Sequence, residues 1–340
     1  MSQPVLPKLP PGSRVQDPLI VLDIESRGGD IPHIILTLGN ATGRLPSAPF
    51  WPSDGHKLAG VVKGTVVDVT GTVGSYRARR QLIVESLRVL PRAQVDWRCL
   101  MPSVGDVRRY WQAVDSWRGE IRGVRLARTL GLFYEDPEFR RRYEECPAST
   151  AGHHAELGGL LKHTWEVAQI ALAICAVHSA AVDQELVLAG ALLHDVGKLE
   201  SYRWEGCFET SVPGAKLGHV VLGALLLERR VRAQSPMPCT ETELMILEHL
   251  ILSHHGALEF GASVPPLTLE AEILHHADNA SAKTASMKGA LEDADNFAGD
   301  EGLSIRGIWQ LDRRRAWRGA SDWGRADPKE GHHEEAVVKG

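Results

Sequence analysis

The chain has 340 residues, 43% of them hydrophobic and 24% charged, which is enough for two domains with real hydrophobic cores. Its net charge of −5 excludes a general electrostatic attraction to nucleic acid, so any such binding must come from local basic patches or from metal ions. The five cysteines are scattered and form no C-x-x-C pair, which argues against a disulfide framework and favours a reducing, cytoplasmic location. No apolar run approaches the length of a membrane span, and we expect no signal peptide and no membrane partner.

The N-terminal quarter of the chain is predicted to be a small β-domain. Residues 1–15 are rich in proline and are expected to form a flexible arm. Short β-rich runs, separated by Gly, Asn, Asp and Pro, then predict strands at Leu19–Ile24, His33–Gly39, Gly64–Val73 and Arg80–Val89. Four or five strands in so short a stretch predict a barrel such as an OB-fold over residues 16–95, although a small β-sandwich would have the same pattern.

The rest of the chain is predicted to be helical, which makes the fold class multidomain, β followed by α. Residues 96–150 hold charged amphipathic segments and are expected to form a helical linker. Residues 151–324 are expected to form one all-α domain, and the polar residues 325–340 a disordered tail. The main helical segments are Gly158–His178, Gln184–Lys198, Gly218–Val231, Glu241–Gly256 and Thr268–Met287.

Histidines and aspartates interrupt these apolar helices in a regular way. A lone histidine on a helix is usually a hydrogen-bonded core or surface residue, but an unpaired polar group in apolar sequence is costly. Five successive helices each contribute at least one such residue, which favours a shared site over chance. The candidates are His163, His194, Asp195, His219, His254, His255 and Asp278.

The pattern of the candidates predicts a metal centre. Adjacent helical residues point in different directions, so both members of His194-Asp195 reach one site only near a helix end, which Gly197 would supply. Gly256 would do the same after the His254-His255 pair. Nitrogen and carboxylate ligands without thiolate suit Mn²⁺, Fe²⁺, Co²⁺, Ni²⁺ or Zn²⁺. Seven ligands exceed the need of one ion, so we expect two ions bridged by Asp195.

Lys198 follows Asp195 by about one helical turn. In that position Lys198 would neutralise charge on a phosphate near the metal centre. The alternative interpretation is an ordinary solvated surface lysine. Asp195 and Lys198 are therefore the candidate catalytic residues.

The order H…HD…H…HH…D, with "HDVGK" at its second step, resembles the HD-domain superfamily of metal-dependent phosphohydrolases. The segments "CPASTAGHHAELGGLLKHTWEVA", "LAGALLHDVGKL", "LGHVVLGA" and "LILSHHGALEFGASVPPLTLEAEILHHADNASAK", together with the preceding β-domain, resemble the YhaM-type 3′→5′ exoribonucleases. The resemblance covers roughly Leu19 to Met287 and implies an OB-fold joined to an HD domain.

The resemblance also implies a distribution of the ligands. One ion, most readily Mn²⁺, would lie at His163, His194, Asp195 and Asp278, and a second at Asp195, His219 and either His254 or His255. The pair His153-His154 matches a family pair ahead of the first ligand, and it would contact substrate or orient a ligand.

The resemblance implies that the β-domain binds nucleic acid through basic and aromatic side chains. Phe50 and Trp51 are candidates for stacking on bases, although both could pack under a loop instead. Tyr76, Arg77 and Arg80 form a second candidate group with Arg79, although such a run also suits a solvated hairpin turn. Residues 288–325 are hard to align with the family, and the segment from Ile308 to Arg325 is either a closing helix of the HD domain or an additional contact to the strand.

The function implied is a metal-dependent 3′→5′ exoribonuclease that hydrolyses single-stranded RNA, or also single-stranded DNA, to nucleoside 5′-monophosphates. A phosphohydrolase of small nucleotides or cyclic dinucleotides is the first alternative, because fold alone does not choose a substrate. The sequence "GALEFG" after His255, in place of a G-Y-P triplet, argues against cyclic dinucleotides. A nucleic-acid-binding regulatory protein with an inactive HD site is the second alternative. The broad apolar helices would also allow a homo-oligomer.

Overall fold

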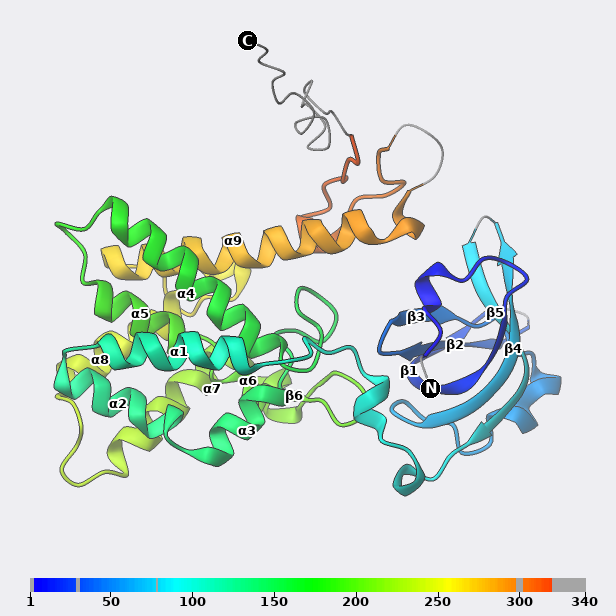
Figure 1. Cartoon of the computed structure of the whole chain (residues 1–340), viewed down its shortest axis with the longest axis horizontal. Coiled ribbons are helices and arrows are strands. Elements are labelled where there is room, and N and C mark those ends of the chain that lie inside the picture. Colours follow the sequence, from blue (N-terminus) through cyan, green and yellow to red (C-terminus); the bar gives the residue numbers. More distant parts are fainter. Residues whose placement is uncertain (1–2, 29–30, 78, 298–301, 320–340) are drawn as a thin grey trace, which may run out of the picture.

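The computed structural model describes residues 3–28, 31–77, 79–297 and 302–319. Figure 1 shows two parts side by side, a β-barrel from the N-terminal segment and a bundle of helices from the rest. All four predicted strand runs overlap strands of the barrel. The strands are β1 (Arg14–Arg27), β2 (His33–Asn40), β3 (Gly43–Pro46), β4 (Val66–Tyr76) and β5 (Arg79–Val89).

The strand order identifies the barrel as OB-like rather than a sandwich. The antiparallel sheet has the order β3-β2-β1-β4-β5. A bridge between Ser47, just after β3, and Leu82 of β5 brings the two edges of the sheet together. Closing a sheet in this way removes its exposed edges. Apolar side chains that alternate along the strands, among them Val67, Val69 and Leu82, fill the interior.

The N-terminal segment differs from the expected flexible arm. Leu6 is completely buried in the barrel core, and the first strand already begins at Arg14. Arg80 donates hydrogen bonds to the backbone carbonyls of Leu6 and Pro7. The segment is therefore packed against the barrel, because the side chain of Leu6 is buried in the barrel core.

The predicted helices are present, with polar residues at several starts. Asp183 and Thr268 accept hydrogen bonds from backbone amides of the first turn, and Thr240 forms a capping box with Glu243. A two-stranded hairpin, β6 (Tyr202–Arg203) with β7 (Glu209–Thr210), separates α6 from α7. The helices are α1 (Arg108–Glu120), α2 (Val124–Tyr134), α3 (Pro137–Glu145), α4 (Gly159–Val177), α5 (Gln184–Leu193), α6 (Lys198–Ser201), α7 (Val212–Arg232), α8 (Glu241–Ser253) and α9 (Leu269–Glu292).

Helices α1 to α3 lie in the segment expected to be a linker, yet they share the core of the helical part. Tyr134 and Tyr143 are buried in one hydrophobic cluster with the apolar residues of α4 and α5. The Tyr134 hydroxyl donates to the carbonyl of Leu192 at 2.6 Å, and the Tyr143 hydroxyl pairs with Thr164 at 2.7 Å. These contacts reach the two helices that carry the first predicted metal ligands.

Helix α4 is long and apolar enough to cross a membrane by length and composition alone, contrary to the expectation from the sequence. One such helix is weak evidence, because the core helix of a globular domain passes the same test. Here Leu160, Val167 and Ala171 of α4 are completely buried in the helical core. We therefore interpret α4 as a core helix.

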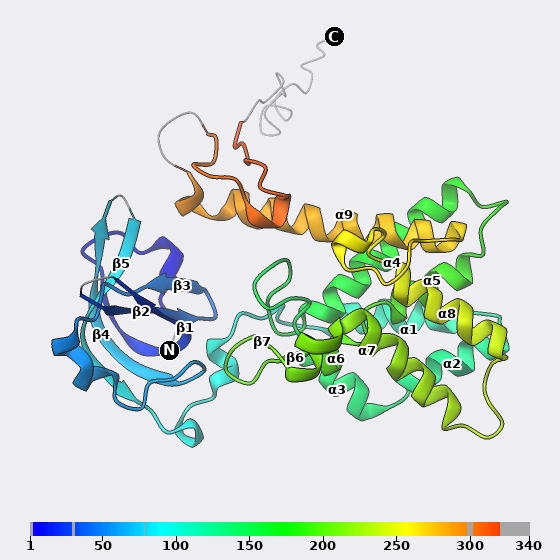
Figure 2. The same ribbon diagram turned by 180° about the vertical axis from the view of Figure 1, so that it is seen from behind.

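The chain runs from the barrel into the helical part (Figure 2), and side-chain contacts join the two parts as well. Arg80 of β5 forms an ion pair of 2.9 Å with Asp295, just beyond α9. Ile20 and Val66 of the barrel belong to the hydrophobic cluster of the helical part. The C-terminal segment 302–319 packs on the end of α9, and its Leu311 is buried in this contact. The tail expected at residues 325–340 lies outside the described residues, and the predicted domain boundaries stay predictions.

Candidate metal centre

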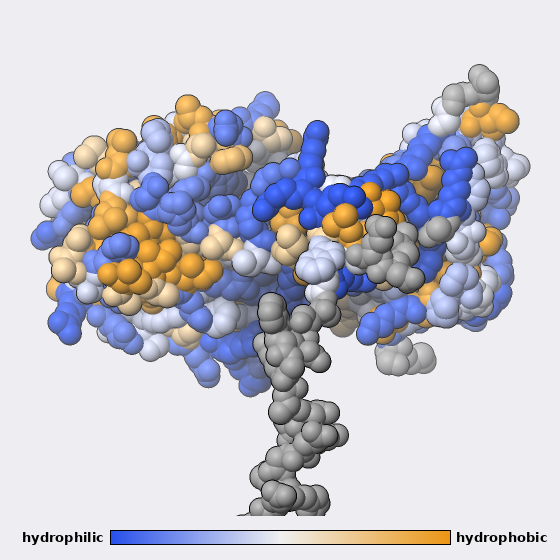
Figure 3. All heavy atoms as spheres, turned by 90° about the horizontal axis from the view of Figure 1, so that it is seen from above, coloured by the Kyte–Doolittle hydropathy of each residue, from blue (hydrophilic) through white to orange (hydrophobic). Residues whose placement is uncertain are grey.

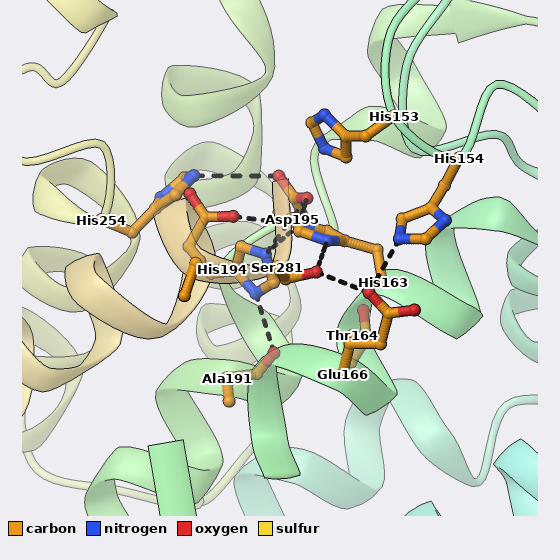
Figure 4. Close-up of polar contacts among 12 residues, drawn as sticks. His153, His154, His163, Thr164, Glu166, Ala191, His194, Asp195, His254 and Ser281 are labelled. Carbon is orange, nitrogen blue, oxygen red and sulfur yellow. Dashed lines mark hydrogen bonds and ion pairs between the residues drawn. The ribbon is translucent and has the colours of Figure 1, made fainter. Parts of the chain in front are cut away.

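The seven predicted ligands lie close together within the helical part, and Figure 4 labels four of them, His163, His194, Asp195 and His254. Donor atoms of His163, His194 and Asp195 lie within 4.8 Å of one another, and we call these three with the adjacent Asp278 the first donor group. Donor atoms of the second donor group, His219, His254 and His255, also lie within 4.8 Å of one another. The first group comes from α4, α9 and the residues after α5. The second group comes from α7 and the residues after α8.

Glycines shape the turns that carry these ligands, though not all for the predicted reason. Gly256, after the histidine pair, has a φ of 77° and Gly218, before His219, a φ of 72°, both in the left-handed region that glycine favours. Gly197 has an ordinary φ of −67°. A Cβ at Gly197 would lie 2.0 Å from the carbonyl oxygen of His219. Gly197 is thus needed for close packing against α7, not to end a helix.

The first donor group surrounds one oxygen of Asp195. Oδ2 of this residue lies 3.1 Å from Nε2 of His194 and 3.4 Å from Nε2 of His163. The same His163 nitrogen lies 3.0 Å from Oδ1 of Asp278. Lys198, which is 5% exposed, places its Nζ 2.5 Å from Oδ2 of Asp195. The reading of Lys198 as a solvated surface lysine is therefore wrong.

The second donor group faces the other oxygen of Asp195. Oδ1 lies 3.4 Å from Nε2 of His219 and 3.8 Å from Nε2 of His254. All three atoms are buried, and none has a hydrogen-bond partner within the described part of the chain. A buried polar atom without a partner costs about 1–3 kcal/mol. A divalent cation between these atoms would satisfy all three, so the residues present fit a metal ion.

Backbone carbonyls fix the orientation of three imidazole rings. A ring that donates its Nδ1 hydrogen leaves Nε2 unprotonated and free to bind a metal. Both members of the pair after α8 are held this way, so both remain candidate ligands. The Nδ1 atoms of His194, His254 and His255 donate to the carbonyls of Ala191, Ile251 and Phe260 at 2.8, 2.7 and 2.8 Å.

A chain of hydrogen bonds orients the fourth ring, and sequence reasoning missed two of its members. Nδ1 of His163 donates to Oγ of Ser281 at 3.0 Å, and Ser281 donates to Oε2 of Glu166 at 2.8 Å. The same Glu166 oxygen pairs with Nε2 of His154 at 2.9 Å. Glu166 and Ser281 each follow a ligand, His163 and Asp278, by three residues, a spacing that shares one helix face and could have revealed them.

The electrostatics of the centre favour metal binding. Burial raises the pKa of Asp195, but Lys198 and His194 outweigh it and hold the pKa well below its usual range. Burial lowers the pKa of His219 to about 3 and holds that of His254 well below its ordinary value. The carboxylate is therefore ionised and these imidazoles are neutral at neutral pH, as metal ligands must be.

Comparisons with known proteins agree with this geometry. A model of the HD domain matches residues 160–283, which include all seven candidate ligands. Three relatives bear the name 3′-5′ exoribonuclease YhaM. They come from Shouchella clausii (31% identical over 267 residues), Halalkalibacterium halodurans (30% over 271) and Bacillus subtilis (29% over 263). The matches cover 77% of this chain and 80%, 80% and 82% of the relatives. The chain belongs to the YhaM family.

Membership in the YhaM family gives the His/Asp cluster a role. An HD domain implies dependence on a divalent metal, which agrees with the orphaned donor atoms. The matches also extend well beyond the HD domain, because their 263 to 271 residues exceed the 124 residues from 160 to 283.

None of the nucleic-acid contacts predicted for the barrel is confirmed. Phe50 is only 4% exposed and packs in the barrel core, so the prediction that its ring stacks on bases is wrong. Trp51 and Tyr76 are 45% and 60% exposed, and the guanidinium of Arg77 lies over the Tyr76 ring at 5.3 Å. These three stay candidates. Arg80 is already engaged by Asp295 and by backbone carbonyls, which leaves it structural.

The histidine pair before α4 lies beside the metal centre rather than on the barrel. The rings of His153 and His154 lie 5.0 and 5.9 Å from that of His163. His154 is tied to Glu166, whereas Nε2 of His153 is buried without a partner among the described residues. His154 is therefore linked to the first donor group through Glu166 and Ser281.

Proposed function

We propose that this protein is a metal-dependent 3′→5′ exoribonuclease that releases nucleoside 5′-monophosphates from single-stranded RNA. The observation that carries the proposal is the position of Asp195, whose two oxygens face two separate groups of donors. A second support is the family, whose curated relatives bear the name 3′-5′ exoribonuclease. The OB-like barrel favours a polymer over a free nucleotide, because a nucleotidase needs no surface for a strand.

The residues that would hold the ions follow from the two donor groups. One ion would be held by His163, His194, Asp195 and Asp278, and the other by Asp195 with the second donor group. Bound divalent ions supply Lewis-acid stabilisation of the phosphodiester and lower the pKa of a water. Mn²⁺ is the proposed ion, with Fe²⁺, Co²⁺, Ni²⁺ or Zn²⁺ as the alternatives that nitrogen and oxygen donors allow.

The chain's own groups would prepare the site for this chemistry. Lys198 keeps its positive charge, because the attraction of Asp195 outweighs the desolvation that would lower its pKa. It would offset the negative charge of a phosphate at the first donor group. His153, with its unpartnered Nε2, would donate to or accept from the terminal nucleotide. Burial lowers the pKa of His153 to about 2, so its ring stays neutral.

We further propose single-stranded RNA as the preferred polymer, single-stranded DNA as a weaker one, and the cytoplasm as the location. Assembly into a homo-oligomer is also proposed. Figure 3 shows a hydrophobic area on the helical part that a second copy could cover. Light scattering of the purified protein would give the number of copies.

The proposal is tested by a time course on 5′-labelled single-stranded RNA with Mn²⁺, comparing the wild type with Asp195→Asn. A ladder that shortens from the 3′ end, and is absent with the variant, is the expected result. Intact RNA with the wild type would overturn the proposal. Free nucleotides and cyclic dinucleotides would then be tried, and RNA binding without cleavage of any of them would favour a regulatory protein.

A further inference from the structure

A cleft of about 920 Å³ lies outside the predicted nucleic-acid face. Its walls are α4, the C-terminal half of α9, the C-terminal segment around Trp309 and the loop before α4, and Arg44 of β3 closes it on the barrel side. Its volume is in the range of cavities that enclose small ligands, about 300–1,000 Å³. Seen from above, hydrophilic side chains gather over the middle of the molecule, between the helical part and the barrel (Figure 3).

The cleft reaches the metal centre. His153 and His154 line it, and both rings lie within 6 Å of His163, at 5.0 and 5.9 Å between centroids. His153, whose buried Nε2 has no partner among the described residues, therefore lies between the cleft and the first donor group. A molecule in the cleft would have one end beside the ligands of the first donor group.

The charges of the cleft suit a phosphate backbone. Two of its carboxylates are engaged by neighbours: Glu156 pairs with Lys162 at 2.9 Å, and Glu166 accepts from Ser281 and pairs with His154. Of the other two in the lining, Glu292 lies 3.9 Å from Lys288 and Asp293 accepts a hydrogen bond from a backbone amide. Arg44 and Arg306 have no carboxylate within ion-pair distance among the described residues, and both are exposed. A free guanidinium is the side chain that best matches a phosphate.

One aromatic side chain is presented in the cleft as a platform. Trp309 lines the cleft and is 76% exposed, an unusual state for so large an apolar ring. Its backbone is held in place, because Leu311 is buried and Lys283 donates to the carbonyl of Gln310 at 3.2 Å. The Gln310 amide donates to the carbonyl of Ala151, in the loop that carries His153. An exposed indole on an anchored backbone is suited to stacking on a base.

We propose that this cleft binds the 3′-terminal nucleotides of single-stranded RNA, with Trp309 stacking on a base and Arg44 and Arg306 binding phosphates. This rests on the proposed function, because it names the place where that substrate meets the metal centre. The C-terminal segment, whose role the sequence left open between a closing helix and a strand contact, is then part of the substrate site. The strand would run between the HD domain and the barrel rather than over the barrel alone.

The first test compares Trp309→Ala with Trp317→Ala. Trp317 is a matched control, because it lies in the same segment, is 66% exposed and does not line the cleft. Binding of a fluorescent oligoribonucleotide is measured by anisotropy in EDTA, where no turnover occurs. Trp309→Ala should weaken Kd about tenfold, and Trp317→Ala should leave it unchanged. Equal binding by both variants and the wild type would overturn the proposal. Thermal melting shows that each variant is folded.

The second test uses charge. Arg306→Ala should lower the dependence of log Kd on log salt by about 0.7, the contribution of one phosphate of a single strand. Arg313→Ala is the control, because Arg313 is also exposed, lies nearby and does not line the cleft. An unchanged slope for Arg306→Ala, or an equal loss for both variants, would count against the cleft.

The third test fixes the direction of the strand. A single 4-thiouridine is placed at the 3′ end or at the 5′ end of the oligoribonucleotide, which is then cross-linked by light in EDTA. The peptide containing Trp309 should be labelled only from the 3′ position. Labelling from the 5′ end alone, or from neither end, would overturn the proposal. If the wild type binds and cross-links as expected but never cleaves RNA, the proposed function fails while the binding site stands.

Discussion

The two donor groups of the metal centre differ in how their polar atoms are paired by the protein itself. In the first, His163 has Asp278 and Ser281 as partners, and Oδ2 of Asp195 has Lys198. In the second, Nε2 of His219 and of His254 have no partner among the described residues. The comparison indicates that the protein itself pairs the polar atoms of the first group, whereas Nε2 of His219 and of His254 would gain a partner only from a bound ion.

Asp195→Asn should have the largest effect, because this residue serves both groups. We expect the variant to lose both ions and to lose activity by more than about a hundredfold, the upper range for residues that only orient ligands. Asp278→Asn is the matched change within the first group, and it should lose one ion at most. Metal content by mass spectrometry after dialysis separates the two. Retention of two ions by Asp195→Asn would contradict the bridging role.

Removing one histidine from each group should affect folding unequally. In EDTA, His163→Ala should lower the free energy of unfolding by about 3 kcal/mol, because it opens a cavity and removes both the ion-pair partner of Asp278 and a hydrogen-bond donor to Ser281. His219→Ala should cost less than about 1 kcal/mol, because it removes a buried nitrogen that has no partner. Urea unfolding measures both. A larger loss for His219→Ala would refute the asymmetry between the groups.

Ser281→Ala should weaken the first group without removing a ligand. The ring of His163 would lose the acceptor that fixes its orientation, and metal affinity should fall about tenfold. Competition with a coloured chelator measures the affinity. Thr284 lies one turn further along α9 and bonds to the carbonyl of Ala280. Thr284→Ala is therefore the control, and an equal loss of affinity there would mean a general effect on the helix.

The second group should also make stability depend on pH. The pKa of His219 is lowered to about 3 by burial, so between pH 6.5 and 3 the unfolded chain binds a proton that the folded chain does not. The free energy of unfolding in EDTA should therefore fall as pH drops below about 6.5, approaching 1.4 kcal/mol per pH unit for this group. His219→Gln should reduce this slope between pH 6.5 and 5. An identical slope in the variant would show that His219 does not contribute.

The clustering of the candidate ligands could be predicted because each of them stands at an apolar border of a helix, where an unpaired polar side chain is costly. The fold of the barrel followed from alternating strands. The surroundings of Arg80 and Phe50 could not be predicted, because they depend on residues far away in the sequence. Arg80 pairs with Asp295, and Phe50 packs in the barrel core. The role of residues 96–150 was missed for a similar reason. In sequence, charged amphipathic helices resemble a linker, because the packing of their aromatic face against the core becomes visible only in the structure.

Gly197 has a consequence for the distance between the two donor groups. A Cβ there would collide with the backbone of α7, at the carbonyl of His219 and at the amide of Gly223, 2.0 and 2.4 Å away. Since backbone cannot turn aside as a side chain can, even alanine would push α7 outward. His219 would move with it, away from Oδ1 of Asp195. The missing methyl group at Gly197 therefore sets how closely the second donor group can approach the first.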